Sequence, residues 1–324
     1  MNMLFAIVAA AGIGGGVNAD VAPAAWQQPL DNLAQVACHN CYEPQYSHGL
    51  PYTAALVHVK TVEIDIWDER DTAAGGALPE HWFVRHNGSP DHASGNDNSC
   101  VGESNDLRAC LGNIRDWSRA NPDHFPLIVI LDKKQDWSAG RMPQDLDHLA
   151  HEVLGSSLYT PAQLDQFHAQ RSGSLRDKVR IGGWPKAQDL RGRILLVLNG
   201  NGLQRYLQDQ GLRGLVFVSP PTESAAEADG LPRGFDPASA GLIVMHNMKS
   251  DFRAASAAVA RNHFIGRVWG DDKETFTQQM GNRTQLSAYY DYMSQQANGY
   301  RIVQMPTAAG AASSQQPTST APAP

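Results

Sequence analysis

Two acidic residues separated by one position, Glu63 and Asp65, stand in an otherwise apolar run. Side chains two positions apart on an extended strand point to the same side, so both carboxylates would project together. Two like charges at that distance are costly unless one is protonated or a cation lies between them. A solvated strand end with two exposed acids is the alternative, and it is disfavoured because Val62, Ile64 and Ile66 interleave them. The pair therefore predicts a cation site.

Asn40 and Asp132 are the residues that we expect to complete this site. Each follows an apolar run with the composition of a strand. Together with Glu63 and Asp65 they offer only oxygen ligands. Such a ligand set favours a hard cation, Ca²⁺ or Mg²⁺, over zinc or copper.

Two histidines, His39 and His86, are predicted to lie beside the cation. Imidazoles titrate near neutral pH, so two of them on opposite sides of a reacting phosphate form a natural general base and general acid. The chain holds 12 histidines, so a single one carries little weight. His246 stays a weaker candidate at another strand end. The remaining ones that we interpret as surface or loop residues include His58, His92, His124, His151 and His168.

The elements that would position these residues alternate between short β-branched runs and helical stretches. Eight strands are predicted at residues 35–38, 62–67, 81–85, 127–132, 194–198, 242–245, 264–269 and 301–304. A ninth run at 215–218 is left out of the sheet because Pro220 and Pro221 end it abruptly. Runs that are apolar on both faces, such as 127–131, suit parallel strands covered by helices.

Helical periodicity is clearest between Leu107 and Trp117, where apolar residues recur at i, i+3, i+4, i+7 and i+10 before Pro122 ends the pattern. An alanine-rich helix is predicted at 254–262. Eight β-then-α units predict an α/β fold with a single, possibly distorted (β/α)₈ TIM barrel. The rival is a doubly wound sheet, but Gly-x-Gly-x-x-Gly is absent after the first strand.

In a (β/α)₈ barrel, functional side chains collect at the C-terminal ends of the strands. Reading the first four predicted strands in order, their ends carry His39 and Asn40, then Glu63 and Asp65, then Arg85 and His86, then Asp132, Lys133 and Lys134. Each of four successive strands would thus bring an ionisable group to the same rim.

The two ends of the chain differ from the rest in composition. Residues 3–17 form an apolar stretch that is too short to span a bilayer, and Val17-Asn18-Ala19 follows as a small-x-small cleavage pattern. We expect a signal peptide over 1–19, a catalytic domain over 20–306 and a disordered tail over 307–324. The mature protein would be secreted or periplasmic, without a transmembrane segment.

The four cysteines are Cys38, Cys41, Cys100 and Cys110. An even count in an exported chain favours disulfides, with three possible connectivities, and a Cys100–Cys110 bridge across a short loop is preferred. A zinc site at Cys38-His39-Asn40-Cys41 is the alternative. It is disfavoured because the spacing of Cys100 and Cys110 does not supply a matching ligand pair.

The whole chain has 324 residues, of which 42% are apolar and 18% charged, so it can bury a sizeable core. Its formal net charge of −7 argues against a nucleic-acid partner. It also lacks the basic charge that would draw it to an anionic membrane surface. Any anion that it handles must be neutralised by something other than net charge.

The ordered motifs resemble the X-type superfamily of phosphatidylinositol-specific phospholipase C, and within it the calcium-dependent, bacterial-type phosphoinositide phospholipase C family. The stretches that carry the resemblance are H-N-C-Y, V-E-I-D-I-W, F-V-R-H, C-L-G-N-I-R-D-W-S-R-A-N-P-D-H-F-P-L-I-V-I-L-D-K-K and R-V-W-G-D. They extend from about Leu33 to Met305. Glu-x-Asp alone is weak, whereas the ordered set is fairly specific.

The resemblance implies a role for each matching residue. The calcium ligands would be Asn40, Glu63, Asp65 and Asp132, and the catalytic histidines His39 and His86. Lys134 and Arg267 would contact the phosphate or the inositol. Arg85 and Trp269, also at strand ends, are the other residues expected at the substrate, a phospholipid at a membrane surface.

The resemblance also implies a reaction. A base, His39 or a carboxylate, would take a proton from the inositol hydroxyl next to the phosphodiester, and His86 would protonate the departing diacylglycerol oxygen, leaving a cyclic inositol phosphate. Asp132 stands where the family pattern has Glu, and the family's closing motif has no clear match. A magnesium-dependent sphingomyelinase D, a glycerophosphodiesterase, whose usual His-Arg-Gly is absent, and a non-catalytic headgroup-binding barrel remain alternatives.

The acidic balance of the chain fits this interpretation. Three carboxylates around one divalent ion fall from a charge of −3 to about −1, and the ion presents positive charge to a phosphate. The sequence therefore predicts that the protein meets an anionic substrate through a metal.

Overall fold

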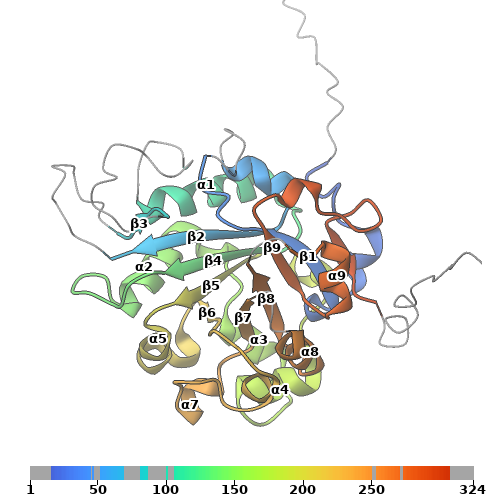
Figure 1. The fold of residues 1–324 in the computed structure, drawn as a ribbon. Coiled ribbons are helices and arrows are strands. Elements are labelled where there is room, and N and C mark those ends of the chain that lie inside the picture. Colours follow the sequence, from blue (N-terminus) through green and yellow to red (C-terminus); the bar gives the residue numbers. More distant parts are fainter. Residues whose placement is uncertain are drawn as a thin grey trace, which may run out of the picture.

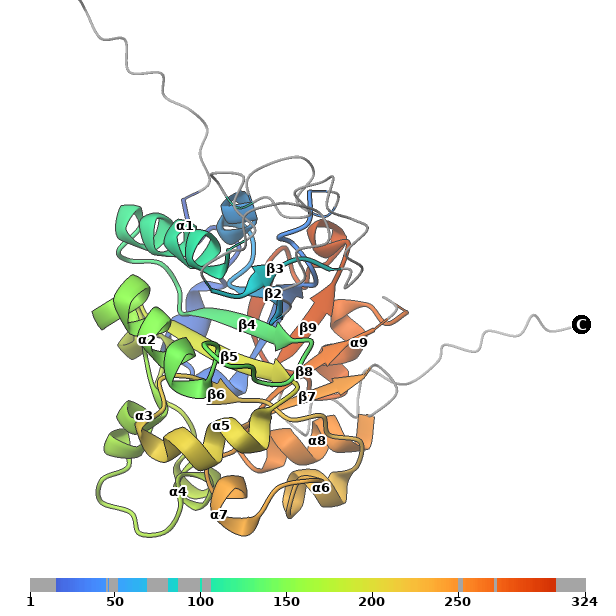
Figure 2. The ribbon, with the colours of Figure 1, turned by 90° about the vertical axis from the view of Figure 1, so that its left-hand side faces the viewer.

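Eight parallel strands curve into a nearly closed barrel with helices around its outside, which confirms the predicted (β/α)₈ fold (Figures 1 and 2). The structure is a computed structural model that describes residues 16–44, 46, 52–68, 81–86, 100, 106–249, 253–270 and 273–306. The barrel strands, in chain order, are β1 (Leu33–Cys38), β2 (Thr61–Trp67), β4 (Leu127–Lys133), β5 (Ile194–Gly200), β6 (Phe217–Val218), β7 (Met245–Lys249), β8 (Ile265–Trp269) and β9 (Leu286–Tyr289).

The helices follow the strands in the alternating order of a barrel. They are α1 (Leu107–Ala120), α2 (Pro143–Leu154), α3 (Pro161–Phe167), α4 (Leu175–Gly182), α5 (Leu203–Gln210), α6 (Ala225–Asp229), α7 (Pro237–Ala240), α8 (Arg253–Arg261) and α9 (Phe276–Gly281). Short 3₁₀ segments are η1 (Pro23–Gln27), η2 (Leu30–Asn32), η3 (Tyr52–Val57), η5 (Gly155–Ser157), η6 (Ala187–Leu190), η7 (Gly211–Arg213) and η8 (Tyr292–Ser294).

The ring of strands runs β6-β5-β4-β2-β1-β9-β8-β7, and its seam lies between β6 and β7. There the two strands share one parallel bridge, between Pro221 and Asn247. Asn247 donates its N–H to the carbonyl of Pro220 at 2.9 Å and accepts from Thr222 at 2.9 Å. Pro221 has no N–H, so a longer ladder is blocked at this point.

Four strand assignments from the sequence were wrong, and a fifth was misplaced, because the run predicted at 242–245 overlaps β7 (Met245–Lys249) only at Met245. Residues 81–85 contain only the two-residue β3 (Phe83–Val84), which pairs antiparallel with the C-terminal part of β2. Residues 301–304 form β10 (Ile302–Gln304), antiparallel to the start of β1. The barrel positions belong instead to 215–218, excluded because of its prolines but present as β6, and to β9, which was not predicted.

The two faces of the barrel strands contribute to two apolar clusters. On β4, Val129 and Leu131 belong to a cluster that includes Leu111 of α1 and Leu146 of α2. The intervening Ile130 belongs to a second cluster, together with residues of β5, β7, β8 and β9. This packing explains why the run 127–131 is apolar on both faces.

Helix α1 has the face that its periodicity predicted. Leu107, Leu111 and Ile114 are buried on it, and Asp106 caps its first turn by accepting a hydrogen bond from the backbone N–H of Arg108 at 2.8 Å. The helix ends at Ala120.

Both pairs of cysteines form disulfides. The predicted Cys100–Cys110 bridge is present, and Cys38 is bonded to Cys41. All four cysteines are thereby used, so the alternative of a zinc site at Cys38 and Cys41 is wrong.

The N-terminal ends of the strands, which we call the barrel floor, are held by ion pairs. Asp20 contacts Arg301 at 2.8 Å and His58 at 3.0 Å. Asp31 contacts His263 at 2.7 Å and accepts the backbone N–H of Trp184 at 3.0 Å. These contacts connect the beginning and the end of the described chain.

Among the described residues, no helix is long and apolar enough to cross a membrane. Residues 1–15 of the expected signal peptide and the expected tail over 307–324 lie outside the described residues.

Candidate active site at the barrel mouth

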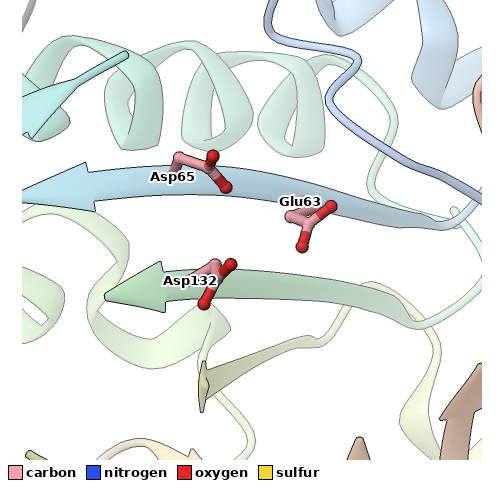
Figure 3. A group of neighbouring side chains, drawn as sticks. All are labelled: Glu63, Asp65 and Asp132. Atoms are coloured by element: carbon pink, nitrogen blue, oxygen red, sulfur yellow. The ribbon is translucent and has the colours of Figure 1, made fainter. Parts of the chain in front are cut away.

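Three carboxylates meet on β2 and β4, with Asp65 and Asp132 near the C-terminal ends of these strands, at the end of the barrel that we call the mouth (Figure 3). Asp65 and Asp132 are register partners on the two strands, and Glu63 lies two residues earlier on the same face as Asp65. One oxygen from each of the three lies within 4.8 Å of the others. Glu63 and Asp65 are 2% and 1% exposed, so the prediction that they project together is confirmed.

Glu63 is contacted by two cationic or ionisable groups. A guanidinium nitrogen of Arg267, on β8, lies 2.7 Å from its Oε2, and Nε2 of His39 lies 3.3 Å from the same oxygen. Arg267 also donates to Oδ1 of Asn247 at 3.1 Å. Burial raises the pKa of Glu63, but Arg267, His39 and Lys134 together outweigh it, so the net pKa is lowered.

Lys134 lies between the other two carboxylates. Its Nζ is 3.0 Å from Asp65 and also bonds to Asp132. Its backbone N–H donates to the carbonyl of Ile66 at 2.9 Å, which fixes the chain at the end of β4. Burial is the main reason why the pKa of Asp65 rises to about 6, and the ammonium of Lys134 opposes that rise.

His39 is held directly after β1. Its backbone N–H donates to the carbonyl of Tyr289 at 2.9 Å. Its ring stacks on Tyr290 with centroids 4.4 Å apart, and Trp269 packs against it edge-on at 5.9 Å. Burial lowers the pKa of His39 to about 4, although the nearby Glu63 opposes this shift.

Asn40 follows with a backbone conformation that is uncommon for a residue with a side chain, since its φ is +57°. Its Nδ2 lies 2.9 Å from Nδ1 of His86, and its backbone N–H hydrogen-bonds to Glu63. Its Oδ1 is buried and accepts no hydrogen bond from the described residues. Asn40 is 1% exposed.

His86 reaches the same site from the segment that follows β3. Its Nδ1 lies 3.3 Å from Glu43 and 3.4 Å from Asp65. A hydrogen bond with Asp65 is the main cause of its raised pKa. Trp67 on β2 donates its indole N–H to the carbonyl of Arg85 at 2.8 Å, which ties the residue before His86 to the barrel. His86 therefore joins the site although β3 is not a barrel strand.

The arrangement fits a hard divalent cation. Three carboxylates and the amide oxygen of Asn40 supply only oxygen donors. Buried polar atoms normally have a hydrogen-bond partner, but this amide oxygen has none among the described residues. It is therefore a fourth oxygen that a cation could bind. Lys134 and Arg267 offset only part of the charge of the three carboxylates.

Most predicted site residues are brought together. His39, Asn40, Glu63, Asp65, His86, Asp132, Lys134 and Arg267 form one connected set, and Trp269 joins it through His39. The guanidinium of Arg85 lies over the rings of Trp67 and Phe83, at 5.7 and 5.2 Å from their centroids.

His246 lies apart from this set. It is fully buried on β7, where Thr222 and Arg176 contact its two ring nitrogens at 2.8 and 3.3 Å. Asn247, its neighbour on the strand, is the residue that contacts Arg267. Successive residues of a strand point to opposite faces, so His246 points away from the mouth.

Three residues of the site were not predicted. Tyr290 was missed together with β9, because Ser287 and Ala288 make that strand less apolar than its neighbours. Glu43 lies three positions after Asn40, and Asn247 directly follows His246, so both are close in sequence to residues that were singled out. Their proximity in sequence was a usable indication.

A model of the family "Phosphoinositide phospholipase C, Ca2+-dependent" matches residues 96–230. Among solved structures, a calcium-dependent phosphoinositol-specific phospholipase C from the Gram-negative bacterium Pseudomonas sp., in its apo form, is 42% identical. The match covers 88% of this chain and 98% of that one, with a TM-score of 0.82. The comparison with curated proteins gave no match.

Two further structures resemble the chain. A structure of the Pseudomonas enzyme described as a myoinositol complex is 41% identical, covers 88% of this chain and 98% of that one, and has a TM-score of 0.81. A Ca²⁺-dependent phosphatidylinositol-specific phospholipase C from Streptomyces antibioticus is 22% identical, with 85% and 98% coverage and a TM-score of 0.68, and supports the fold alone. The chain belongs to the calcium-dependent phosphoinositide phospholipase C family and is an enzyme of the phosphodiesterase type.

Proposed function

We propose that the protein cleaves phosphatidylinositol to diacylglycerol and a cyclic inositol phosphate at the barrel mouth. The observation that carries the proposal is the convergence of three carboxylates and two histidines on one buried site. A protein that only binds headgroups has no need for two imidazoles beside a cation site. We infer the substrate class from the family and the reaction steps from the residues of the site.

Asn40, Glu63, Asp65 and Asp132 are the residues that we assign to a bound Ca²⁺. The ion would supply positive charge against a phosphate oxygen, where negative charge increases in the transition state. We assign Lys134 and Arg267 to the same anion, since Arg267 contacts Glu63 and Lys134 contacts both Asp65 and Asp132. A phosphate entering the mouth thus meets fixed cationic side chains.

We assign His39 as the general base. Its Nε2 faces Glu63, while its Nδ1 is buried without a hydrogen-bond partner among the described residues. Nδ1 is therefore the atom that would take the proton from the inositol hydroxyl next to the phosphodiester. The rings of Tyr290 and Trp269 hold the imidazole in place, which supplies the orientation that such a proton transfer needs.

We assign His86 as the general acid. It lies nearer the surface than His39, with 41% of its side chain exposed against 9%. The departing diacylglycerol oxygen carries the lipid and must leave toward solvent or membrane. Since Nδ1 of His86 is engaged by Asn40, Glu43 and Asp65, donation would come from Nε2.

Arg85 and Trp269 complete the proposed substrate contacts. Trp269, half-buried at the end of β8, offers an aromatic face beside His39. Arg85 directly precedes His86 in the chain, and its guanidinium lies over the rings of Trp67 and Phe83.

The test is cleavage of phosphatidylinositol vesicles followed by phosphorus NMR. A cyclic phosphate signal that EGTA abolishes, and that Ca²⁺ but not Mg²⁺ restores, supports the proposal. The variant His86→Ala should lose most of its turnover, and full retention of activity in this variant would remove His86 from the mechanism. Headgroup affinity without product would identify a binding protein, and choline release from sphingomyelin would identify the sphingomyelinase D alternative.

We also propose that the protein is exported and acts on lipid at a membrane surface. Two disulfides are typical of oxidising compartments. Mass determination of protein recovered from the periplasm or the medium would test cleavage after Ala19. An intact N-terminus on a cytosolic protein would contradict both export and the proposed domain boundary.

A further inference from the structure

Cys38 and Cys41 close a turn of four residues that contains His39 and Asn40. Cys38 is the last residue of β1, and both cysteines are almost completely buried, at 1% and 0% exposure. The bridge therefore lies beneath the site, among the apolar residues that support the barrel wall.

The turn has an unusual backbone. Asn40 adopts a left-handed conformation, with φ at +57°. Asparagine tolerates this region better than most residues with a side chain, but it remains disfavoured. Such conformations persist where the surrounding structure enforces them, and they concentrate at functional sites. The covalent bond between the two flanking residues is one such constraint.

Four site contacts depend on this turn. It directs the imidazole of His39 to Glu63 at 3.3 Å and the amide of Asn40 to His86 at 2.9 Å. It leaves Oδ1 of Asn40 buried without a hydrogen-bond partner among the described residues. It also starts the segment in which Glu43 donates its N–H to the carbonyl of Asn40 at 2.9 Å and contacts His86 at 3.3 Å.

We infer that the Cys38–Cys41 disulfide is a positioning element of the active site, which holds Asn40 in the left-handed turn that aims His39, Asn40 and the partner of His86. This inference rests on the proposed function of the same site. It assigns the bridge to catalysis and metal affinity more than to the stability of the fold.

The chain contains a matched control in the Cys100–Cys110 disulfide. That bridge spans ten positions and attaches the chain to the first turn of α1, on the outside of the barrel. In the chain-entropy account, a bridge that closes a longer loop stabilises the folded state more. Loss of the control bond should therefore lower thermal stability more than loss of the bond at the site. Loss of the bond at the site should lower turnover more than loss of the control bond.

The experiment compares the variants Cys38→Ala/Cys41→Ala and Cys100→Ala/Cys110→Ala with the wild-type full chain. Four quantities are measured: kcat and KM on phosphatidylinositol with Ca²⁺, the Kd of Ca²⁺ by calorimetry, thermal unfolding, and amide hydrogen exchange without metal. Small misplacements of reacting groups cost about 100-fold in rate, and lost support of metal ligands costs about 10- to 100-fold in affinity.

For the pair at the site we expect kcat to fall about 100-fold, KM to change little and the Ca²⁺ Kd to rise about tenfold. Amide exchange should accelerate at His39 and Glu43, whose N–H groups bond to Tyr289 and Asn40. The control pair should keep the wild-type kcat, Kd and exchange at these two amides, and it should lose more thermal stability than the pair at the site.

Wild-type kcat and wild-type exchange at His39 and Glu43 in the variant at the site would overturn the inference. If the alanine pair does not fold, Cys38→Ser/Cys41→Ser is the second variant. Failure of both to fold, with the control folded, would also overturn it, because the bridge would then be required for folding. A wild-type protein without turnover would end the proposed function, whereas the exchange comparison needs neither substrate nor metal and would still decide this inference.

Discussion

The floor and the mouth of the barrel both contain buried charges, but they arrange them differently. At the floor, Asp31 is contacted by His263 and by the backbone N–H of Trp184, and Asp20 is contacted by Arg301 and His58. Each of these two carboxylates has its own cationic or ionisable partner. The contacts join segments that are distant in sequence, so they act as fasteners.

At the mouth, the carboxylates are shared and incompletely matched. Lys134 contacts both Asp65 and Asp132. Arg267 contacts Glu63 and also donates a hydrogen bond to Asn247. Three acids gather within 4.8 Å, and an amide oxygen beside them accepts no hydrogen bond from the described residues. Incomplete matching is costly for stability, so it indicates a site that is completed by something else. The same residue types thus hold the chain together at the floor and form a binding site at the mouth.

Replacing an acid at the mouth should give the largest effect. We expect Asp65→Asn to reduce kcat/KM about 100- to 1,000-fold, the loss that follows removal of one well-placed electrostatic group from an active site. Thermal stability should change little, because the variant relieves crowding among the acids. Kinetics on phosphatidylinositol and a melting curve check this, and activity near that of the wild type would contradict the division between mouth and floor.

Calcium should stabilise the folded protein through the residues of the mouth and not through those of the floor. At 100 times its Kd, a ligand that binds only the folded protein adds about 2.7 kcal/mol of stability. We expect the melting temperature to rise with Ca²⁺ and to fall again with EGTA. The variant Asp65→Asn is the comparison that should lose this rise, whereas Asp31→Asn should keep it.

Asp31→Asn at the floor should cost about 1–2 kcal/mol of unfolding free energy, because it removes a charge-assisted contact at a buried carboxylate. His263 is half-exposed, so the ion pair itself contributes little of this. Urea unfolding measures the loss. Turnover should stay within about twofold of the wild type, and a large loss of turnover would show that the two ends are coupled.

Lys134→Met should move binding and turnover in opposite directions. Its ammonium now lies against Asp65 and Asp132, so its removal should tighten Ca²⁺ binding, by roughly tenfold for the loss of one nearby charge. Turnover should fall because a phosphate contact is lost. Calorimetry and kinetics on the same preparation test both, and weaker Ca²⁺ binding would contradict the proposed ligand set.

The last prediction concerns the pH dependence of stability and the buried Lys60 at the floor. Burial lowers the pKa of Lys60 to about 7, against an ordinary value of 10.5. Between these values the unfolded chain binds more protons, so the contribution of Lys60 to stability increases with pH through this window and is lost as pH falls toward 7. Lys60→Met should flatten this part of the pH profile of unfolding, and an unchanged slope would contradict it.

Much of the site followed from short-range patterns. The alternation around Glu63 and Asp65 fixed which side chains face the mouth, because a strand has a period of two. The strand count was right for partly wrong reasons, since two of the eight predicted strands are antiparallel additions.

What could not be predicted depended on tertiary context. The run 215–218 ends at two prolines, which is incompatible with a central ladder but acceptable at the seam of the barrel. β9 contains the small residues Ser287 and Ala288, and all four of its residues are buried in the ring of strands. A strand without a run of large apolar residues is hard to recognise from the sequence. The Cys38–Cys41 bond was predicted only as the pair left over by Cys100–Cys110, because a spacing of three positions also fits a metal ligand pair.

The position of β1 has a consequence for how the chain reaches this structure. Its neighbours are β2, which follows soon after it, and β9 and β10, which come from the last part of the described chain. The strand that precedes His39 therefore acquires its full set of hydrogen bonds only when nearly all of the barrel has been synthesised. Pairings between such distant segments fold slowly and leave edges exposed in the meantime. The active site should accordingly be the last region to become ordered.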